Sequence, residues 1–149
     1  MLRVTSPAFY DGASIPKKYT CDGENVSPPL TLVNVPEKTQ SLAVMMIDQD
    51  SSSGHFTHWV LFNLDHAIGH LPERYVPYSG SFGQNDYGHS SYGGPCPNTG
   101  KHRYTITVYA LDIKLNLSAG ANRSSLKSAM TGHILEEAEL KGLYQKVKV

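Results

Sequence analysis

Residues 41–48, SLAVMMID, constrain the fold most strongly, because the run is apolar almost without a break and ends in an aspartate. A continuous run of this length is typical of a strand buried on both faces, although a short buried helix gives a similar pattern. Residues 58–64, HWVLFNL, and 102–111, HRYTITVYAL, are rich in the β-branched and aromatic residues that favour strands. We therefore predict three central strands and a shorter one at 30–35, which Pro36 ends.

The end of the chain changes from strand-like to helix-like patterns. Residues 124–130, SSLKSAM, and 134–142, ILEEAELKG, consist mostly of helix formers, with Ser124 or Ser125 as a cap and Gly142 as a stop. Strands followed by short C-terminal helices indicate a mainly β or α+β fold rather than alternating βαβ units.

Length and charge limit the classes of function. A chain of 149 residues is expected to form a single domain, 1–149. The formal net charge is +0, so no basic surface for nucleic acid is expected. The N-terminal residues lack the apolar core of a signal peptide, and no segment approaches the length of a membrane-spanning helix. We expect no integral membrane segment and a cytoplasmic protein.

Two cysteines are present, Cys21 and Cys96. Reduced thiols are the expectation for a cytoplasmic chain, and a disulfide between them remains open. Cys96 lies in a long Gly-, Pro- and Ser-rich connection over residues 72–101, which is the kind of loop that usually carries function.

Ionisable side chains stand at the ends of the three predicted strands. Asp48 and Asp50 close the first strand, and His58 opens the second after a turn short enough to bring the chain back antiparallel. His102 and Tyr104 begin the third. By strict alternation each of these side chains shares one face of its strand with apolar residues. The aspartates share a face with Leu42, Val44 and Met46; His58 with Phe56, Val60 and Phe62; and His102 and Tyr104 with Ile106 and Val108. Polar groups at the mouth of an apolar crevice are typical of a small-molecule site.

These residue types indicate a site for a small anion. Two histidines can donate N–H groups to an anion, and a carboxylate behind either one favours the doubly donating cation. Glycines 93 and 94, in YGGPCPNTG, allow close backbone approach and anion-binding amides. The Tyr104 hydroxyl is a further donor. The aspartates leave room for a cationic neighbour of the anion.

The sequence resembles the phosphatidylethanolamine-binding protein (PEBP) family, in its bacterial Raf kinase inhibitor-like branch. Two blocks are specific: Asp-x-Asp followed by His-Trp, and Gly-Pro-Cys-Pro followed by Gly-x-His-Arg-Tyr. The resemblance covers nearly the whole chain, in the stretches FYDGASIPKKYTCDGENVSPPL, SLAVMMIDQD, FTHWVLFNL, YGGPCPNTGKHRYTITVYALD and MTGHILEEAEL.

The resemblance implies a Greek-key antiparallel β-sandwich with short C-terminal helices and a pocket for phosphate, acetate or a phosphoethanolamine head group. It also suggests regulation of a kinase or other protein partner, and a homodimer. The apolar residues Ile134, Leu135 and Leu140 are expected to serve either a second subunit or the core, and no cofactor is expected. The implied pocket residues are Asp48, Asp50, His58, Gly94, Pro95, His102 and Tyr104.

Some residues depart from the family pattern. Gln49 and Ser52 stand where the family usually has prolines, so the loop after the first strand is expected to be less rigid here. Asn98 replaces a further common proline, and Leu32 a usual tryptophan. The ionisable positions are all kept.

Each residue also has a purely structural interpretation. Asp48 and Asp50 are good turn formers, His58 can be a core histidine bonded to a carbonyl, and His102 can be a solvated strand start. Tyr104 can belong to the core, and the two glycines can serve only a turn.

Two functional hypotheses follow from the same residues. The first is a non-enzymatic binding protein, because no nucleophile is evident. The alternative is a metal-dependent hydrolase in which the Asp and His side chains hold a divalent ion. A serine hydrolase using residues 51–53 ranks lowest, because the G-x-S-x-G turn is missing.

Overall fold

The predicted central strands form the middle of a sheet in the computed structural model, which describes residues 1–78 and 80–146. They are β4 (Ser41–Asp48), β5 (Phe56–Leu64) and β8 (Lys101–Leu111). The shorter predicted strand is β3 (Leu30–Val33). Local composition was sufficient here, because β4 lies between β5 and β8 and is buried along almost its whole length.

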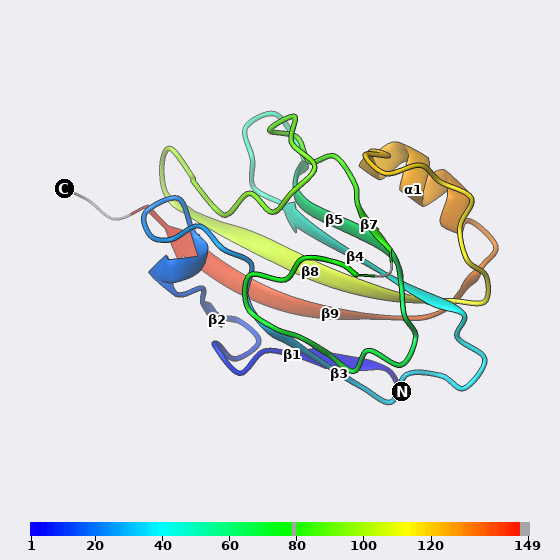
Figure 1. The fold of residues 1–149 in the computed structure, drawn as a ribbon. Helices are drawn as coiled ribbons and strands as arrows, with labels where there is room; N and C mark the ends of the chain where they lie inside the picture. Colours follow the sequence, from blue (N-terminus) through cyan, green and yellow to red (C-terminus); the bar gives the residue numbers. More distant parts are fainter. Residues whose placement is uncertain (79, 147–149) are drawn as a thin grey trace.

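The described strands form two sheets (Figure 1). The smaller has the order β1-β3-β6, with β1 at Arg3–Thr5 and β6 at His70–Leu71. The larger has the order β2-β9-β8-β4-β5-β7, with β2 at Ala13–Ser14, β7 at Ser81–Phe82 and β9 at Ile134–Gln145. β2 and β9 are parallel and the other pairs antiparallel, so the fold is mainly β with one mixed sheet. The predicted Greek-key connectivity stays a prediction.

Both faces of the large sheet are covered, which explains the unbroken apolar run in β4. Leu42, Val44 and Met46 pack in a cluster that also contains residues of the small sheet. Ala43 and Met45 point the other way, into a second cluster with Leu126 and Met130 of the helix α1 (Arg123–Met130). Figure 1 shows β1 and β3 on one side of the large sheet and α1 on the other.

The prediction of two C-terminal helices is half right. The first helix is α1, and Asn122 rather than a serine caps it, because its side chain accepts a hydrogen bond from the Ser125 amide at 2.9 Å. The prediction for residues 134–142 is wrong, because this segment begins the strand β9. β9 pairs with β8 along nearly its whole length, and this long-range pairing outweighs the local helix propensity of its Glu, Ala and Leu residues.

The expectation of reduced cysteines is also wrong. Cys21 and Cys96 form a disulfide that closes a sequence separation of 75 residues, with their Cα atoms 5.4 Å apart. It joins the loop after the short 3-10 helix η1 (Lys17–Tyr19) to the long connection between β7 and β8. Sequence alone did not bring these loops together, because their contact depends on the packing of distant segments.

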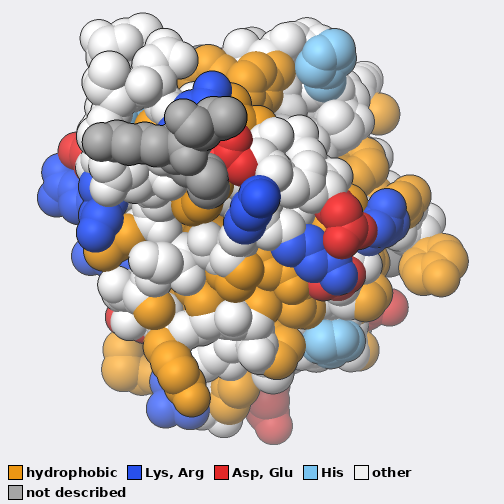
Figure 2. Space-filling model, turned by 90° about the vertical axis from the view of Figure 1, so that its left-hand side faces the viewer, with side chains coloured by type: hydrophobic (Ala, Val, Ile, Leu, Met, Phe, Trp, Pro, Cys, Tyr) orange, Lys and Arg blue, Asp and Glu red, His pale blue; other side chains and the backbone are white. Residues whose placement is uncertain are grey.

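The surface bears on the predictions about partners. No helix in the described residues is long and apolar enough to cross a membrane. On the face that Figure 2 presents, basic and acidic side chains lie next to one another. Of the predicted dimer residues, Ile134 and Leu135 are exposed, whereas Leu140 is 1% exposed and belongs to the core. Leu140 is therefore not available to a second subunit.

Candidate functional site

A β-bulge in β5 positions the first histidine of the site. Along β4 and β5, Met46 pairs with Trp59 but the next residue, Ile47, pairs with Thr57. The pairing of β4 with β8 is regular over the same residues, so the extra residue lies in β5 and is His58. A bulge of this kind re-aims a side chain and is common beside functional sites.

The bulge overturns the strict alternation predicted for β5. Val60 and Phe62 pack on the α1 side of the sheet. Phe56 pairs directly with Asp48, and the His58 ring lies 5.0 Å from the Phe56 ring and 5.4 Å from the Tyr104 ring between centroids. The side chains of His58 and Phe56 therefore lie on the same face of the large sheet as Asp48, whereas those of Val60 and Phe62 lie on the opposite face.

Asp48 and His102 form the centre of the site. Asp48 is 5% exposed, and its Oδ2 accepts a hydrogen bond from His102 Nδ1 at 2.7 Å. Its Oδ1 accepts a second from the Asp50 amide at 2.8 Å, so the turn-forming interpretation of Asp48 also holds. His102 Nε2 lies 3.1 Å from the carbonyl oxygen of Thr99. Both ring nitrogens thus face acceptors, and only a doubly protonated ring donates to both.

His58 is held differently from His102. Its Nδ1 lies 2.7 Å from the Gly93 carbonyl oxygen, which accepts hydrogen bonds only, so Nδ1 carries the proton. Its Nε2 is buried and has no hydrogen-bond partner in the part of the chain that the structure describes. Burial lowers the pKa of His58 below its ordinary value, more than the Gly93 carbonyl and Asp48 raise it. His58 therefore presents a lone pair at Nε2 in the free protein, where the sequence argument assumed an N–H donor.

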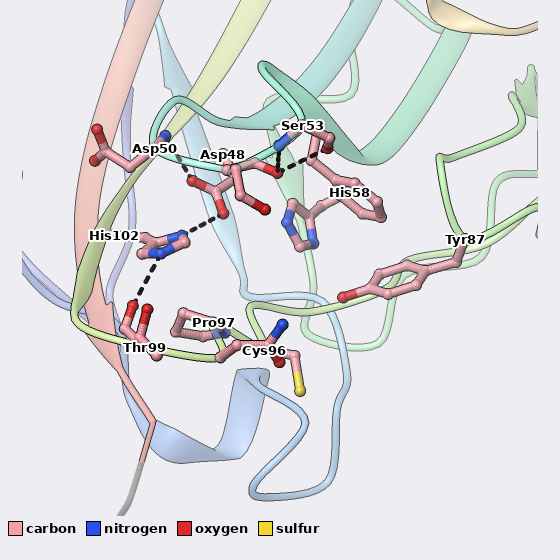
Figure 3. A pocket seen from close by; sticks show the side chains of 13 residues that line it. Asp48, Asp50, Ser53, His58, Tyr87, Cys96, Pro97, Thr99 and His102 are labelled. Carbon is pink, nitrogen blue, oxygen red and sulfur yellow. Dashed lines mark hydrogen bonds and ion pairs between the residues drawn. The ribbon is translucent and has the colours of Figure 1, made fainter.

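Asp50 is paired outside the centre of the site. Its two carboxylate oxygens accept hydrogen bonds from the Arg103 guanidinium, both at 2.9 Å. The hydrogen bonds from Arg103 lower the pKa of Asp50 to about 2. Figure 3 shows the carboxylate directed away from His58. Asp50 thus belongs to the rim of the site, and Arg103 offsets its charge.

These side chains surround a cavity of about 500 Å³ at the end of the large sheet (Figure 3). Four of the predicted residues line it: Asp48, Asp50, His58 and His102. The wall is completed by Ser51, Ser52, Ser53, Phe56, Tyr87, Cys96, Pro97, Asn98 and Thr99.

Gly94 and Pro95 are not among the residues that line this cavity. The Gly94 amide donates to Asn25 Oδ1 at 2.9 Å, and the Pro95 carbonyl accepts from the Cys21 amide at 3.1 Å. A Cβ on Gly94 would meet the carbonyl oxygen of Tyr19, so this glycine is required by close packing of two loops. The Gly93 amide also has an acceptor, the His58 carbonyl at 3.0 Å. The two amides are therefore already used, and a direct role for Gly94 and Pro95 in ligand binding stays a prediction.

Tyr104 also lies beneath the cavity rather than in its wall. It pairs with Asp48 across β4 and β8, is 1% exposed, and its hydroxyl makes no hydrogen bond to the described residues. Burial, together with the charge of Asp48, raises the pKa of Tyr104 well above its ordinary value. The hydroxyl stays protonated and is a buried donor next to Asp48.

Several wall residues were not among the predicted ligands. Residues 51–53 directly follow Asp-x-Asp, and residues 97–99 directly precede Gly-x-His-Arg-Tyr. Both segments therefore lie within the two specific sequence blocks. Tyr87 reaches the cavity from the long connection, and its hydroxyl donates to the Gly94 carbonyl at 3.0 Å. No sequence signal distinguished Tyr87 from the other tyrosines of that loop.

The geometry does not favour the metal-dependent alternative. Within residues 1–78 and 80–146, no group of three or more His, Cys, Asp and Glu side chains is arranged to hold a metal ion. Asp50 is engaged by Arg103, and both nitrogens of His102 already face oxygens of the protein. The hydroxyls of Ser51 and Ser53 lie 3.1 Å from each other, without a histidine partner among the described residues, so the serine hydrolase gains no support either.

Comparisons with known proteins agree with the resemblance in the sequence. The family model for phosphatidylethanolamine-binding protein matches residues 5–145. The chain belongs to the phosphatidylethanolamine-binding protein family. A UPF0098 protein of Methanothermobacter thermautotrophicus is 44% identical over 97% of this chain and 99% of its own length. Another, of Chlamydia pneumoniae, is also 44% identical, with the same coverage of both chains.

Solved structures of PEBP relatives share the fold. A Chlamydia trachomatis PEBP homologue superimposes with a TM-score of 0.94 at 38% identity and covers 98% of both chains. An E. coli protein described as a new member of the mammalian PEBP family gives a TM-score of 0.91 at 27% identity, over 98% of this chain and 99% of its own. Membership of this family supports a binding protein.

Proposed function

We propose that this PEBP-family protein is a non-enzymatic binding protein whose ligand is a small anion, either a free phosphate or carboxylate or a phosphoethanolamine-like head group. The observation that carries the proposal is that Nε2 of His58, a residue of the cavity that Asp48 and His102 also line, has no hydrogen-bond partner among residues 1–78 and 80–146. A buried polar atom without a partner costs free energy unless a ligand or water satisfies it. The cavity therefore gains from a ligand with a polar group at this position.

The protonation of His58 sets what the ligand must bring. Neutral His58 accepts a hydrogen bond at Nε2, so it suits the O–H of a protonated phosphate. For an anion without a proton, such as acetate, His58 must take up a proton itself, and the imidazolium then donates to the anion. In both cases one proton lies between His58 and the anion. Because acetate brings none, its binding is coupled to the uptake of a proton.

A thermal-shift titration tests the proposal. The protein is titrated with phosphate, acetate, phosphoethanolamine and, separately, zinc. A ligand of the folded state at 100 times its Kd adds about 2.7 kcal/mol of stability, which is readily detected for a domain of this size. We expect stabilisation by the anions in the wild type and its loss in His58→Ala and His102→Ala. Stabilisation by zinc alone would favour the metal-dependent alternative instead.

A regulatory role would use the same cavity. Here the ligand is a phosphorylated side chain of a partner protein such as a kinase, and the proposal rests on the resemblance to the Raf kinase inhibitor-like branch. A pull-down that recovers the same protein with the wild type but not with His102→Ala supports this role. Recovery of the partner protein with both the wild type and His102→Ala argues against the cavity as the contact.

We also propose a homodimer and a cytoplasmic location, as the sequence predicted. The exposed side chains Ile134 and Leu135 are the remaining candidates for the dimer contact. A monomer in sedimentation at micromolar concentration would contradict the dimer. The disulfide is more typical of oxidising compartments, so fractionation of cells together with thiol trapping of Cys21 and Cys96 tests the location.

A further inference from the structure

A second cavity lies on the other side of the large sheet, between β5 and the start of α1. It has a volume of about 480 Å³. Its walls come from the sheet side and from the first turns of the helix. The lining residues are Thr57, Asp86, Asn122, Arg123, Ser124, Lys127 and Ser128. It shares no lining residue with the cavity of Asp48 and His102.

The start of α1 offers hydrogen-bond donors to this cavity. The first amides of a helix have no acceptor within the helix. The Asn122 side chain satisfies the Ser125 amide, whereas the amides of Arg123 and Ser124 find no acceptor among the described residues. Such amides, together with the helix dipole, attract anions.

The sheet side of the same cavity contains a buried hydroxyl, that of Thr57, whose pairing with Ile47 places its side chain on the α1 face. Thr57 is 1% exposed, and its Oγ1 has no hydrogen-bond partner within the described chain. Thr57 is a wall residue of the second cavity, so a ligand there can satisfy this hydroxyl. This observation is independent of the helix and itself indicates a polar ligand.

The charges favour an anion that carries a donor. Arg123 and Lys127 form no ion pair with the described residues. The acidic side chain of the wall is Asp86, and its Oδ2 already accepts a hydrogen bond from the Thr57 amide at 2.7 Å. Two cations without an ion-pair partner in the described part of the chain, and one partly satisfied carboxylate, leave a net positive site. Asp86 suits an O–H or ammonium hydrogen beside the anionic group.

We propose that this second cavity is a binding site for the phosphate group of a small phosphorylated molecule. Arg123, Lys127 and the first amides of α1 hold the phosphate oxygens, Thr57 donates from below, and Asp86 accepts from a protonated oxygen or a neighbouring hydroxyl of the ligand. The site does not depend on Asp48 or His102.

Titration of the labelled protein with inorganic phosphate, followed by amide NMR shifts, tests the site. We expect saturable shifts at the amides of Arg123 and Ser124, in the wild type and equally in His102→Ala. Arg123→Gln and Thr57→Val each remove one donor to a charged group and should weaken this binding about tenfold or more. Thr57→Val keeps the shape of a side chain whose hydroxyl has no partner within the described residues, so the fold should be retained. Lys114→Gln, an exposed lysine outside the cavity, is the matched control and should leave the affinity unchanged.

Three outcomes would overturn the proposal. The first is the absence of saturable shifts at the start of α1. The second is their disappearance in His102→Ala, because the shifts would then be transmitted from the other cavity. The third is an unchanged affinity in Arg123→Gln and Thr57→Val, since general charge attraction would then account for the effect.

Discussion

Asp48 and His102 meet at the ends of β4 and β8, with 2.7 Å between Oδ2 and Nδ1, although 54 residues separate them in the sequence. The other oxygen of Asp48 accepts the Asp50 amide, so the same carboxylate joins the turn after β4 to the start of β8. A side chain with two acceptors is required here, because two donors converge on it.

Asp48→Asn tests this requirement. Asparagine has the same shape but a single acceptor oxygen. If that oxygen keeps the Asp50 amide, the NH₂ group faces His102 Nδ1, which accepts only in a neutral ring that carries its proton on Nε2. We expect the free energy of unfolding to fall by about 1–2 kcal/mol, because a hydrogen bond to a charged carboxylate is replaced by a weaker one between neutral groups. Chemical denaturation at neutral pH measures the change.

The chain supplies a matched control for this substitution. Asp112 accepts a hydrogen bond from His133 Nδ1 at 2.9 Å, with the two side chains 44% and 40% exposed. Asp112→Asn should change stability by less than about 1 kcal/mol, because water replaces the lost acceptor. Equal losses in the two variants would contradict a special role for the buried pair.

Acetate binding should become tighter as the pH falls. Burial lowers the pKa of His58 below its ordinary value of 6.5 in the free protein, and a bound anion raises it by stabilising the imidazolium. The complex then holds more protons than the free protein, so affinity increases as the pH falls through the pKa of the complex and levels off below that of free His58. Acetate is a suitable probe because it stays ionised above about pH 5.5.

Calorimetry of acetate binding between pH 5.5 and 8 measures this dependence. Proton uptake on binding should appear as a dependence of the heat on the buffer, and both effects should be absent in His58→Gln.

The lowered pKa of His58 also has a consequence for folding. Stability from neutral His58 is present above the unfolded-state pKa of about 6.5 and is lost as the pH falls through the folded-state pKa. For acetate, an affinity that stays constant between pH 5.5 and 8 would contradict the coupling of binding to His58.

Local patterns predicted the parts of this structure that depend on local composition. β4, β5 and β8 follow from apolar and β-branched runs, and alternation correctly placed Asp48 and His102 on the face of Met46 and Ile106. Alternation failed at His58, because a bulge adds one residue to β5 and no residue type marks it. The failure occurs within the site itself, where re-aiming a side chain is useful.

Long-range contacts account for the remaining errors. Residues 134–142 have helix formers, yet Ala138, Leu140 and Tyr144 also repeat with a period of two, which fits the face that β9 buries after pairing with β8. Only the neighbouring strand decides between the two patterns. At Gly94 a long-range contact also matters, because the small size of this residue serves the contact with Tyr19; its role in anion binding stays a prediction.

Loss of the disulfide should lower stability more than ligand affinity. In the chain-entropy model, closing a loop of 75 residues contributes about 4.5 kcal/mol through the unfolded state. The bridged loops are also joined by the hydrogen bonds of Cys21 to Pro95 and of Gly94 to Asn25. We therefore expect Cys21→Ser/Cys96→Ser to unfold about 2–4 kcal/mol more easily, with phosphate affinity within about threefold of the wild type.

Denaturation and phosphate titration of the double serine variant, beside the wild type with and without reductant, check this expectation. The reduced wild type is the control for the serine side chains and should behave like the variant. A large loss of affinity with unchanged stability would contradict the prediction, because the bond would then act on the cavity wall through Cys96 rather than on the unfolded chain.

Arg103 should influence anion binding without contacting the anion. Its guanidinium offsets the charge of Asp50 at the rim and holds the pKa of that carboxyl at about 2. Arg103→Gln leaves Asp50 as an uncompensated negative charge beside the cavity, so phosphate should bind about threefold more weakly at low ionic strength. At 1 M salt, where the Debye length falls to about 3 Å, phosphate affinity should be nearly that of the wild type. The pKa of Asp50 should rise toward its ordinary value of 3.8 in the same variant, which carboxyl NMR measures directly.

Arg3→Gln, on the exposed side of β1, removes the same charge away from the cavity and is the control. An equal effect of both substitutions would show that net charge alone acts on the anion, whereas a loss confined to Arg103→Gln and abolished by salt would identify the neutralised rim as the cause.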